Sequence, residues 1–550
     1  MKISTFVIII LTLLKFTPAY AQDDNLKIRI ASNGKIVSFG YFEGQLIFNN
    51  GDTLGGDFSK FNWDSGYFLA CYDSTGQTLW TRFLKNQGLN CSGFCPGIGL
   101  CIDKNDQILV TGGFTDTIYF NSGYYLNTAS LSSFIAEYDL NGIIISAHRS
   151  TENQSWSKGV DIDVDLNRNI YVTGTFYDSL SFGSLSINYN LPKDGIYILK
   201  YDSAWNPVWL TSINSNSSMV PIQQEVYSLD VSDSGNVFLC GYFGGGIGRG
   251  NLVIGSLGII SDSLMYSSFF LKVDMNGNAI WLNKGTTLTS AYYFGNFAEQ
   301  IVSDNSGNAY AVGYFYSQIE FGNLPVLTAG NSTDLYLVKF DPSGNPSWTL
   351  QSTHSGNMGF IQAAGLAVDR NQNIVTIGNA DVNVIFSPLP PSGGNGFLIK
   401  HDSTSNPLCI QSYIGSLQDI CLDSLGNAFT IASITGSHFS SIKITKWNTL
   451  CNTTFDILIE NDFVNRIESP EKTDEVHIFP NPIQNNFNIT LLHDKPVDLQ
   501  IYSWDGKIIL TKKLLEKITT VDFQDIVPGI YTCVLKGENF TTVKRIVKVD

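Results

Sequence analysis

A seven-fold repeat, a composition rich in strand and turn formers, and a C-terminal segment outside the repeat predict an all-β protein. One pattern of apolar runs, joined by turns of the form Asp-x-x-Gly-Asn, recurs about every 65 residues. Aromatic residues make up 13% of the chain, charged residues only 15%, and there are 50 glycines. Such a mixture suits strands and tight turns. We therefore predict a seven-bladed β-propeller followed by a small immunoglobulin-like β-sandwich.

The fifth copy shows the repeat most clearly. An apolar run, residues 301–303, leads into Asp304-Asn-Ser-Gly307-Asn308 and a second apolar run, residues 309–315. A second hairpin follows over residues 335–349. The period is marked by the glycine after the second run, which is Gly40, Gly112, Gly174, Gly241, Gly313 and Gly378, with Ala432 in the last copy. Each copy thus supplies four short strands, the content of one propeller blade.

Several of these runs are apolar on both faces. In residues 335–340, as in 196–201 and 269–273, apolar side chains point to both sides because successive residues of a strand alternate. Each strand therefore needs a cover on both faces, which neighbouring copies provide. An open solenoid would also provide it but needs end caps, so closure of the seven copies into a ring is the favoured arrangement.

The turns between runs follow a common chemistry. An aspartate in the first position accepts hydrogen bonds from backbone N–H groups two residues on, and glycine or asparagine adopts positive φ. Examples are Asp233-Ser-Gly235-Asn236 and Asp341-Pro-Ser-Gly344-Asn345. These copies resemble the repeats of bacterial seven-bladed β-propellers found in exported proteins, over residues 25–457. The resemblance implies a fold and no particular activity.

The N-terminus predicts export. Lys2 precedes a nine-residue apolar run, Phe6 to Leu14, and Ala19-Tyr20-Ala21 forms a small-x-small cleavage site. Residues 1–21 are therefore predicted to be a secretory signal peptide. A transmembrane helix is the alternative, but the run is too short and Lys15 interrupts it. No later segment has about 18 uninterrupted apolar residues, so no transmembrane segment is expected.

The repeat stops before the C-terminus. Residues 458–475 are acidic and polar and are predicted to be a linker, and residues 476–550 show strand alternation with an Asp-Gly turn. This tail resembles the C-terminal sorting domain of substrates of the Bacteroidetes type IX secretion system. The resemblance implies transport across the outer membrane by that machinery, removal of the tail, and surface attachment or release. An adhesion module that stays on the protein is the alternative. The matching residues are Phe479, Pro480, Asn481, Pro482, Gly529, Tyr531 and Lys544.

The net charge and the cysteine content limit which binding partners, metal sites and disulfides the sequence predicts. A net charge of -16 argues against nucleic acid or an anionic membrane surface, which would repel the chain. The nine cysteines and six histidines show no metal-ligand spacing, so a zinc site is not expected. After export, Cys91 and Cys95 are candidates for a local disulfide, and a second pair is possible among Cys409, Cys421 and Cys451. Buried thiols are predicted for Cys71, Cys101 and Cys240.

Two segments resemble ligand loops only in part. Residues 243–250 are glycine-rich, but residues 251–255 after them are strand-like, whereas a phosphate loop leads into a helix. Asp161-Ile-Asp163-Val-Asp165 resembles the opening of a calcium loop but lacks its glycine and terminal glutamate. Asp161 and Asp163 are expected to share one strand face, toward the central channel. No cofactor is predicted, with calcium as the alternative.

Recurring lysines and aromatic residues in insertions complete the candidates. A lysine stands two residues before the second turn in five copies, which favours a structural role over catalysis; these are Lys200, Lys272, Lys339, Lys400 and Lys446. Cys71 and Glu137 replace it in two copies. Trp63, Trp156, Tyr292 and Tyr293 are assigned to inserted loops, where such rings stack on sugars, anchor a protein partner, or pack against the blades.

No linear catalytic motif accompanies the export signals. The favoured function is therefore that of a non-enzymatic cell-surface or secreted binding protein, whose loops present a surface to a glycan or protein ligand. One alternative is an exported polysaccharide hydrolase or lyase with acids gathered at the channel mouth, because a repeat scaffold assembles sites from distant residues. A structural role in adhesion or matrix is the third.

Overall fold

The computed structural model describes two compact units, Met1–Val464 and Asn465–Asp550. The described residues are 26–43, 45–55, 65–87, 97–121, 123–151, 155–189, 193–215, 223–244, 251–260, 266–288, 295–354, 359–392, 395–435, 440–461, 476–479, 485–491, 496–503, 507–516, 518–527, 529–536 and 541–548. Their regular elements are all β-strands, so the all-β prediction is confirmed. None of the described segments is a helix long and apolar enough to cross a membrane. The predicted signal peptide lies outside the described residues.

The first unit contains seven antiparallel sheets of four or more strands within its described residues, numbered here along the chain. The first sheet has β1 (Leu26–Ile30), β2 (Ile36–Glu43), β5 (Ser65–Tyr72) and β6 (Thr78–Asn86). The second has β7 (Ile98–Ile102), β8 (Ile108–Phe114), β11 (Ser132–Tyr138) and β12 (Ile144–Arg149). The third has β13 (Trp156–Val164), β14 (Ile170–Tyr177), β17 (Asp194–Tyr201) and β18 (Pro207–Ser215). The fourth has β19 (Gln223–Val231), β20 (Val237–Gly244), β23 (Tyr266–Val273) and β24 (Ala279–Lys284).

The remaining three sheets follow the same order of strands. The fifth has β26 (Asn296–Ser303), β27 (Ala309–Glu320), β28 (Leu327–Phe340) and β29 (Pro346–Gln351). The sixth has β31 (Ile361–Val368), β32 (Ile374–Ala380), β34 (Gly396–His401) and β35 (Pro407–Tyr413). The seventh has β36 (Ser416–Leu422), β37 (Ala428–Thr435), β38 (Ser440–Trp447) and β39 (Thr453–Asn461). Shorter strands between them are β3 (Gln45–Ile47), β4 (Thr53–Gly55), β9 (Thr117–Asn121), β10 (Tyr124–Asn127), β15 (Ser179–Phe182), β16 (Leu185–Asn188), β21 (Asn251–Ile254), β22 (Leu257–Ile260), β25 (Thr286–Thr287), β30 (Thr353–His354) and β33 (Val384–Ile385).

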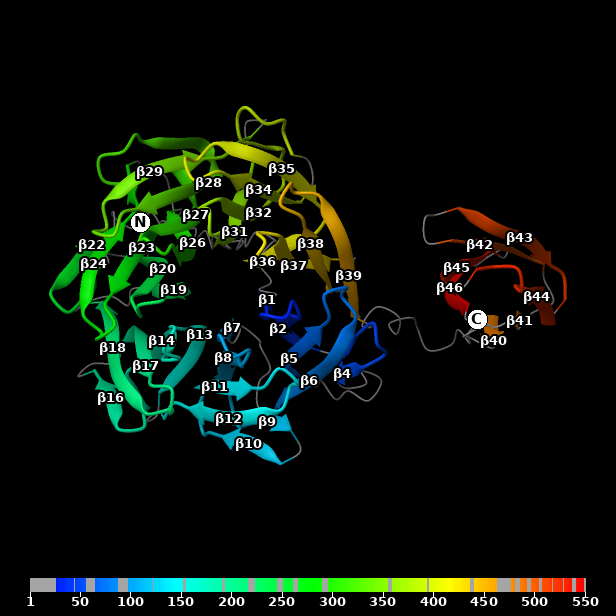
Figure 1. Ribbon diagram of the computed structural model, residues 1–550, viewed down its shortest axis with the longest axis horizontal. Helices are drawn as coiled ribbons and strands as arrows, with labels where there is room; N and C mark the ends of the chain where they lie inside the picture. The colour runs from blue at the N-terminus through cyan, green and yellow to red at the C-terminus, as the bar shows by residue number, and fades with distance from the viewer. Residues whose placement is uncertain are drawn as a thin grey trace, which may run out of the picture. The chain divides into compact units, whose positions relative to one another are not determined.

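The seven sheets are arranged around a common centre, with the first strand of each nearest to it (Figure 1). The first sheet contacts the last as well as the second, since β1 packs against both β36 and β7. The hairpin β3–β4 from the start of the chain also pairs with β39, with Leu46 opposite Asn461. This pairing gives the edge strand of the seventh sheet a partner. The N-terminal part of the chain thereby ties the last sheet to the first.

In the third, fourth and fifth sheets, a carbonyl oxygen of the first strand leaves no room for a side chain at the glycine that marks the period. The ladder between the first two strands shifts register by a bulge, as at Val226/Ser228 in the fourth sheet. A Cβ on Gly241 would lie 2.0 Å from the Glu225 carbonyl oxygen, and one on Gly313 would lie 2.0 Å from the Phe297 oxygen. A side chain at either position would force the strands apart, because real Cβ atoms do not approach so closely.

The predicted turn chemistry is confirmed at Asp304 and Asp341, whereas in the fourth sheet Ser232 takes the place predicted for Asp233 and its Oγ accepts from Asn236 N–H at 3.1 Å. In the fifth sheet, Asp304 Oδ1 accepts hydrogen bonds from the backbone N–H groups of Ser306 and Asn308, at 2.9 and 3.0 Å. Gly307 in that turn has φ +80°. In the second turn of the same sheet, hydrogen bonds from Asn345 and the neighbouring backbone lower the pKa of Asp341. These contacts hold the charged form of the aspartate and fix the hairpin.

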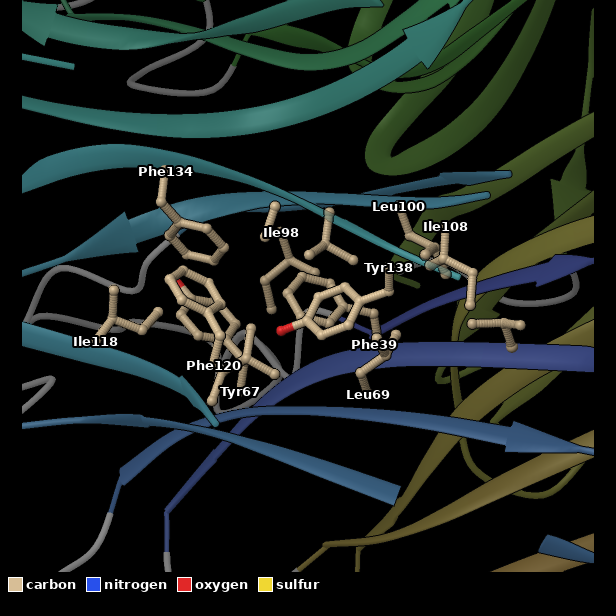
Figure 2. Close-up of a cluster of buried hydrophobic side chains, with 14 of the residues drawn as sticks. Phe39, Tyr67, Leu69, Ile98, Leu100, Ile108, Ile118, Phe120, Phe134 and Tyr138 are labelled. Carbon is tan, nitrogen blue, oxygen red and sulfur yellow. The ribbon is translucent and has the colours of Figure 1, made fainter. Parts of the chain in front are cut away.

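The core of the first unit lies between adjacent sheets. Figure 2 shows the cluster between the first and second sheets, where Phe39 and Tyr67 face Ile98 and Phe134. Phe39 and Tyr67 stack with ring centroids 5.3 Å apart, and Tyr67 meets Phe134 edge to face at 5.2 Å. All four side chains are at most 3% exposed. Strands apolar on both faces thus find cover in neighbouring sheets, as their sequences predict.

Within its described segments, the second unit has two sheets around one core. One sheet has β40 (Val476–Phe479), β41 (Asn486–Leu491) and β44 (Ile518–Asp522); the other has β42 (Val497–Tyr502), β43 (Ile508–Leu514), β45 (Gly529–Lys536) and β46 (Thr541–Lys548). Phe487 and Val521 from the first sheet share a buried cluster with Leu499, Tyr531 and Cys533 from the second. The two sheets therefore cover each other's apolar faces.

The boundary between the repeat and the predicted linker differs from expectation by a few residues. Residues 458–461 were assigned to the linker because the segment is acidic, but they continue strand β39. Glu460 and Asn461 pair there with Ile47 and Leu46 of β3. Backbone pairing with a distant hairpin is not visible in local composition. Residues 462–475 lie outside the described residues.

Candidate functional site

A cavity lies where the first strands of the seven sheets meet, and we call it the axial cavity. It encloses about 270 Å³ and takes lining residues from β1, β7, β13, β19, β26, β31 and β36. Arg29, Asp161, Asp163 and Asp230 are its charged lining groups among the described residues. The expectation that Asp161 and Asp163 share a strand face toward the centre is therefore confirmed.

The acids around the axial cavity bind backbone amides of the next sheet. Asp161 Oδ2 accepts from Leu229 N–H at 2.9 Å, and Asp163 Oδ2 accepts from Val231 N–H at 2.8 Å. Asp230 repeats the contact with Ser303 N–H at 2.8 Å, in the following sheet. These carboxylates act as clamps between first strands. The hydrogen bonds offset part of the hydration that each carboxyl group loses on burial.

A fourth carboxylate joins the two ends of the first unit. Asp419 Oδ2 in β36 accepts from Ile28 N–H at 2.9 Å and lies 2.6 Å from Arg29 Nη1 in β1. Its side chain is 1% exposed, while that of Arg29 is 25% exposed. The ion pair therefore connects the last sheet to the first at the edge of the axial cavity.

Burial changes the acidity of the axial carboxylates. The pKa of Asp163 is raised, chiefly by loss of water and further by the charge of Asp230. Burial also raises the pKa of Asp230, opposed by its hydrogen bonds from Ser303. The pKa of Asp161 is raised by burial, against the nearby charges of Lys27 and Arg29. Two coupled acids that gain protons more readily than usual therefore face the cavity.

The partial calcium-loop motif does not bring its three acids together. Asp161 and Asp163 face the axis, while Asp165 Oδ1 accepts from the N–H groups of Asn167 and Asn169 in its own turn. In the part of the chain that is described, no three His, Cys, Asp or Glu side chains are placed to hold a metal ion. Asp165 is therefore a turn aspartate, as its alignment with other copies indicates.

Of the four aromatic residues predicted to contact a ligand, Trp156 lies within the described part of the chain. Trp63, Tyr292 and Tyr293 lie outside the described residues. Trp156 begins strand β13, where we expected a loop, and stands opposite Tyr177 in the ladder. Their rings are nearly parallel, with centroids 6.4 Å apart. The glycine-rich segment that we excluded as a phosphate loop is followed by strand β21, as expected.

One of the anticipated disulfides is present. Cys409 in β35 and Cys451 in the turn before β39 are joined, which confirms a pair among the three cysteines near the end of the repeat. Cys71, Cys101 and Cys240 are buried thiols, as predicted. Burial raises the pKa of Cys71 to about 11, so this thiol is a packing group at neutral pH. Cys91 and Cys95 lie outside the described residues.

The recurring lysines connect neighbouring sheets, in line with their predicted structural role. Lys200 Nζ donates to the Met275 carbonyl at 2.9 Å, and Lys272 Nζ donates to the Pro342 carbonyl at 3.1 Å. Both carbonyls occupy the same place in the second turn of the next sheet. The ammonium groups also lie over aromatic rings, Lys200 over Tyr171 at 5.0 Å.

Sequence reasoning missed a second cavity, between the second and third sheets. It has a volume of about 420 Å³ and is lined by Asn105, Gln107, Glu137, Ile145, Ser146, Arg168 and Trp205. We call it the inter-sheet cleft. In the sequence, several residues of the cleft differ from those at the equivalent positions of other copies. Only one such difference, Glu137 in place of the recurring lysine, is identified from the sequence alone.

Comparison with known families concerns the second unit. Residues 477–549 match the family described as the secretion system C-terminal sorting domain. The tail is a sorting domain. This domain directs the chain across the outer membrane by the type IX system, to the cell surface or the medium.

Relatives of the first unit are distant. The chain is 23% identical over 370 residues to an uncharacterised WD repeat-containing protein of Acanthamoeba polyphaga mimivirus, covering 56% of this chain and 26% of that protein. The chain thus spans about a quarter of that relative's length.

Solved structures with some similarity include two bacterial proteins. PorZ of Porphyromonas gingivalis, a surface component of the type-IX secretion system, is 10% identical, with a TM-score of 0.18 over 96% of this chain and 98% of that one. BamB of Moraxella catarrhalis is 11% identical, with a TM-score of 0.30 over 80% and 93%. Scores this low support no conclusion about the activity of this chain.

The residues that suggested the sorting domain fall within the matched range. Phe479 ends β40, and Gly529 begins β45. Tyr531 is 5% exposed, donates a hydrogen bond to the Val527 carbonyl at 2.7 Å and meets Phe523 edge to face. Lys544 stands opposite Cys533 in the ladder of β45 and β46. Pro480, Asn481 and Pro482 lie outside the described residues.

Proposed function

We propose that this protein is a binding or adhesion protein of the cell surface or medium, delivered by the type IX system. In this proposal the seven sheets of the first unit are the blades of a seven-bladed propeller, and the second unit is a small immunoglobulin-like sandwich. The propeller presents a surface to a glycan or protein ligand. The match of residues 477–549 to the sorting domain supports delivery of the first unit outside the cell.

One observation favours binding over catalysis. Around the axial cavity, Asp161, Asp163, Asp230 and Asp419 each accept a hydrogen bond from a backbone N–H of the neighbouring sheet. A general acid or base must reach the substrate with a lone pair or proton. These carboxylates are committed to holding the first strands together, which is the work of a scaffold.

An exported polysaccharide hydrolase or lyase is the alternative. The observation in its favour is the pair Asp163 and Asp230, two buried acids at the axial cavity with raised pKa values. A carboxyl group with a raised pKa keeps its proton near neutral pH and so can act as a general acid.

The deciding experiment uses the secreted chain as purified from the medium or cell surface. It is applied to an array of neutral and acidic polysaccharides and of surface glycoproteins from the same medium, and the products of every bound polymer are analysed. We expect binding without change in polymer length. Depolymerisation that is lost in an Asp163→Asn, Asp230→Asn double variant would replace the binding proposal with the alternative. Absence of binding to every member of the array would overturn the proposed function.

A further inference from the structure

A repeated contact links neighbouring sheets at three junctions on the side of the hairpin turns. A tryptophan of the fourth strand lies against the glycine of the following sheet's second turn. Trp80 packs on Gly142, Trp209 on Gly277 and Trp281 on Gly344; a Cβ on any of these glycines would lie 2.6 to 3.0 Å from the indole. The residue paired with the tryptophan in the third strand is usually a lysine, as in Lys272 opposite Trp281. The indole thus fills the space between two sheets.

The junction of the second and third sheets breaks this pattern at three positions. Glu137 and Ser146 occupy the paired lysine and tryptophan positions of the second sheet. Trp205 occupies the glycine position of the third sheet's turn, with φ +64°. The large ring therefore comes from the opposite side of the junction, and a serine stands where the first, third, fourth and fifth sheets have a tryptophan.

These substitutions leave the inter-sheet cleft open. Ser146 lies in its lining beside Ile145, which is 49% exposed, and Trp205 forms another part of the wall. The ring of Trp205 is held from behind by His148, whose ring stacks on it at 4.3 Å. A cleft of about 420 Å³ with a fixed aromatic wall and several polar groups has the size and character of a small-ligand site.

Of the described lining residues of the cleft, Arg168 is the single cation, and it is already paired with two carboxylates. Arg168 Nε donates to Asp103 Oδ2 at 2.7 Å, and Arg168 Nη2 donates to Glu137 Oε1. Arg168 Nη1 binds the Ser203 carbonyl at 3.2 Å, the turn position that lysines reach in other sheets. Glu137 Oε2 accepts from Trp205 Nε1 at 2.9 Å. Because one guanidinium is shared by two carboxylates, these three groups carry a net negative charge and leave no surplus cation for an anionic ligand.

One polar atom in the cleft has no partner among the described residues. Gln107 Oε1 is buried and accepts no hydrogen bond there. Leaving a buried acceptor unpaired is unfavourable, because the atom has lost its hydrogen bond to water without gaining another. The exposed side chain of Asn105 lies in the same lining. The unpaired acceptor is therefore an amide oxygen, which recognises uncharged donors such as hydroxyls.

We propose that the inter-sheet cleft binds a neutral saccharide unit of a polysaccharide. A sugar ring offers hydroxyl donors to Gln107 and an apolar C–H face to Trp205 and Ile145, and it brings no charge that the cleft would need to balance. The net charge of -16 disfavours acidic polymers as well. This inference rests on the proposed binding function and names its site and ligand class.

The test measures binding of the secreted chain to glucan, galactomannan and xyloglucan, with polygalacturonate as the charged comparison. Ser146→Trp restores the residue of other sheets and fills the cleft, so affinity for the bound neutral polymer should fall at least about tenfold. Gln107→Ala should weaken it in the same direction without adding bulk. Ser146→Ala, which keeps the space, should remain within about twofold of the parent.

Two controls distinguish failure of the cleft as a binding site from failure of the proposed binding function. Ser347→Trp adds an indole to the exposed position before Trp348 in another sheet and should leave binding unchanged. Thermal unfolding of every variant checks the fold, and Gln107→Ala carries the test if Ser146→Trp unfolds. Neutral-polymer binding unaffected by both cleft variants, or binding of polygalacturonate or glycoprotein alone, overturns the cleft site while the binding function stands. No binding to any polymer or glycoprotein overturns both.

Discussion

The indole of Trp281 lies against Gly344 of the next sheet so closely that a Cβ on Gly344 would meet Trp281 Cγ at 2.6 Å. Gly344 also has φ +88°. We expect Gly344→Ala to lower the free energy of unfolding through both backbone strain and displacement of the indole, by about 2–4 kcal/mol. Gly307→Ala is the matched control, because Gly307 has φ +80° but no neighbour closer than 3.8 Å. Equal losses in urea denaturation of the two variants would contradict the packing role of the indole.

The disulfide takes the place of this indole contact between the sixth and seventh sheets. Cys409 stands opposite Lys400, where the fifth sheet has Trp348 opposite Lys339. The bond closes a loop with a sequence separation of 42 residues. Loop entropy predicts that the Cys409→Ser, Cys451→Ser double variant loses about 3–4 kcal/mol of unfolding free energy. Denaturation of the parent with and without reductant gives the same comparison. Cys421→Ser, which leaves the bond intact, should show reductant sensitivity like the parent.

The axial acids should respond to pH in a direction set by burial. The pKa of Asp163 is raised in the folded protein, so its contribution to stability is present below the unfolded pKa and is lost as pH rises through the folded value. Asp163→Asn removes this loss. The stability of the variant minus that of the parent should therefore be larger at pH 8 than at pH 4. The measurement is the melting temperature across that range. A difference that does not change with pH would show that Asp163 is not buried as described.

At the edge of the same cavity, Asp419→Asn should lower the stability at high pH, whereas Asp163→Asn should raise it. Asp419 accepts from Ile28 N–H and pairs with Arg29, which is mostly buried. Removing its charge takes away the carboxylate that contacts the guanidinium directly, and we expect a loss of about 3 kcal/mol at pH 8. Chemical denaturation at that pH checks the value. A variant as stable as the parent would mean that this pair does not hold the first and last sheets together.

His401 should make the first unit sensitive to acid. It is 2% exposed, and burial lowers its pKa to about 4 from the usual 6.5. The stability that it contributes is present above pH 6.5 and is lost as pH falls through about 4. We expect His401→Phe to reduce the loss of stability over this window by about 3 kcal/mol. Denaturation at pH 7 and pH 4 measures it. An unchanged slope would place the acid-sensitive group elsewhere.

Removal of the sorting domain should change where the protein is found without changing the fold of the first unit. Deletion of residues 476–550 should leave the protein inside the outer membrane of a bacterium with a functioning type IX system. Fractionation and surface labelling follow the location, and protease resistance of the retained protein follows its fold. Undiminished surface export of the truncated chain would show that the tail does not direct secretion.

Local sequence was sufficient wherever the structural cause is itself local. The turns at Asp304 and Asp341 form from contacts within five residues, so the motif predicts them. The period of Gly241 and Gly313 was also visible, although its cause, a carbonyl oxygen of the bulged neighbouring strand, was not. Assignment of Asp161 and Asp163 to one face followed from strand alternation alone.

Partners that come from another sheet could not be assigned in advance. Asp161 binds Leu229, Asp419 binds Ile28, and β39 extends beyond the predicted linker boundary to pair with β3. The inter-sheet cleft combines Gln107, Ser146, Arg168 and Trp205 from two hairpins of each of two sheets. Its members are ordinary residues when read one at a time, and they form a site only because the sheets meet there.

Strand content, turns, the repeat period and the secretion address follow from the order of residues, because hydrogen bonds and side-chain alternation within a hairpin are specified over short distances. The clamps at the axis, the disulfide contact between Cys409 and Cys451 and the opening beside Ser146 depend on the spacing of neighbouring sheets. That spacing is set by how large side chains of one sheet fit the small ones of the next. A serine in place of one indole therefore becomes a cleft only when both sheets are in position.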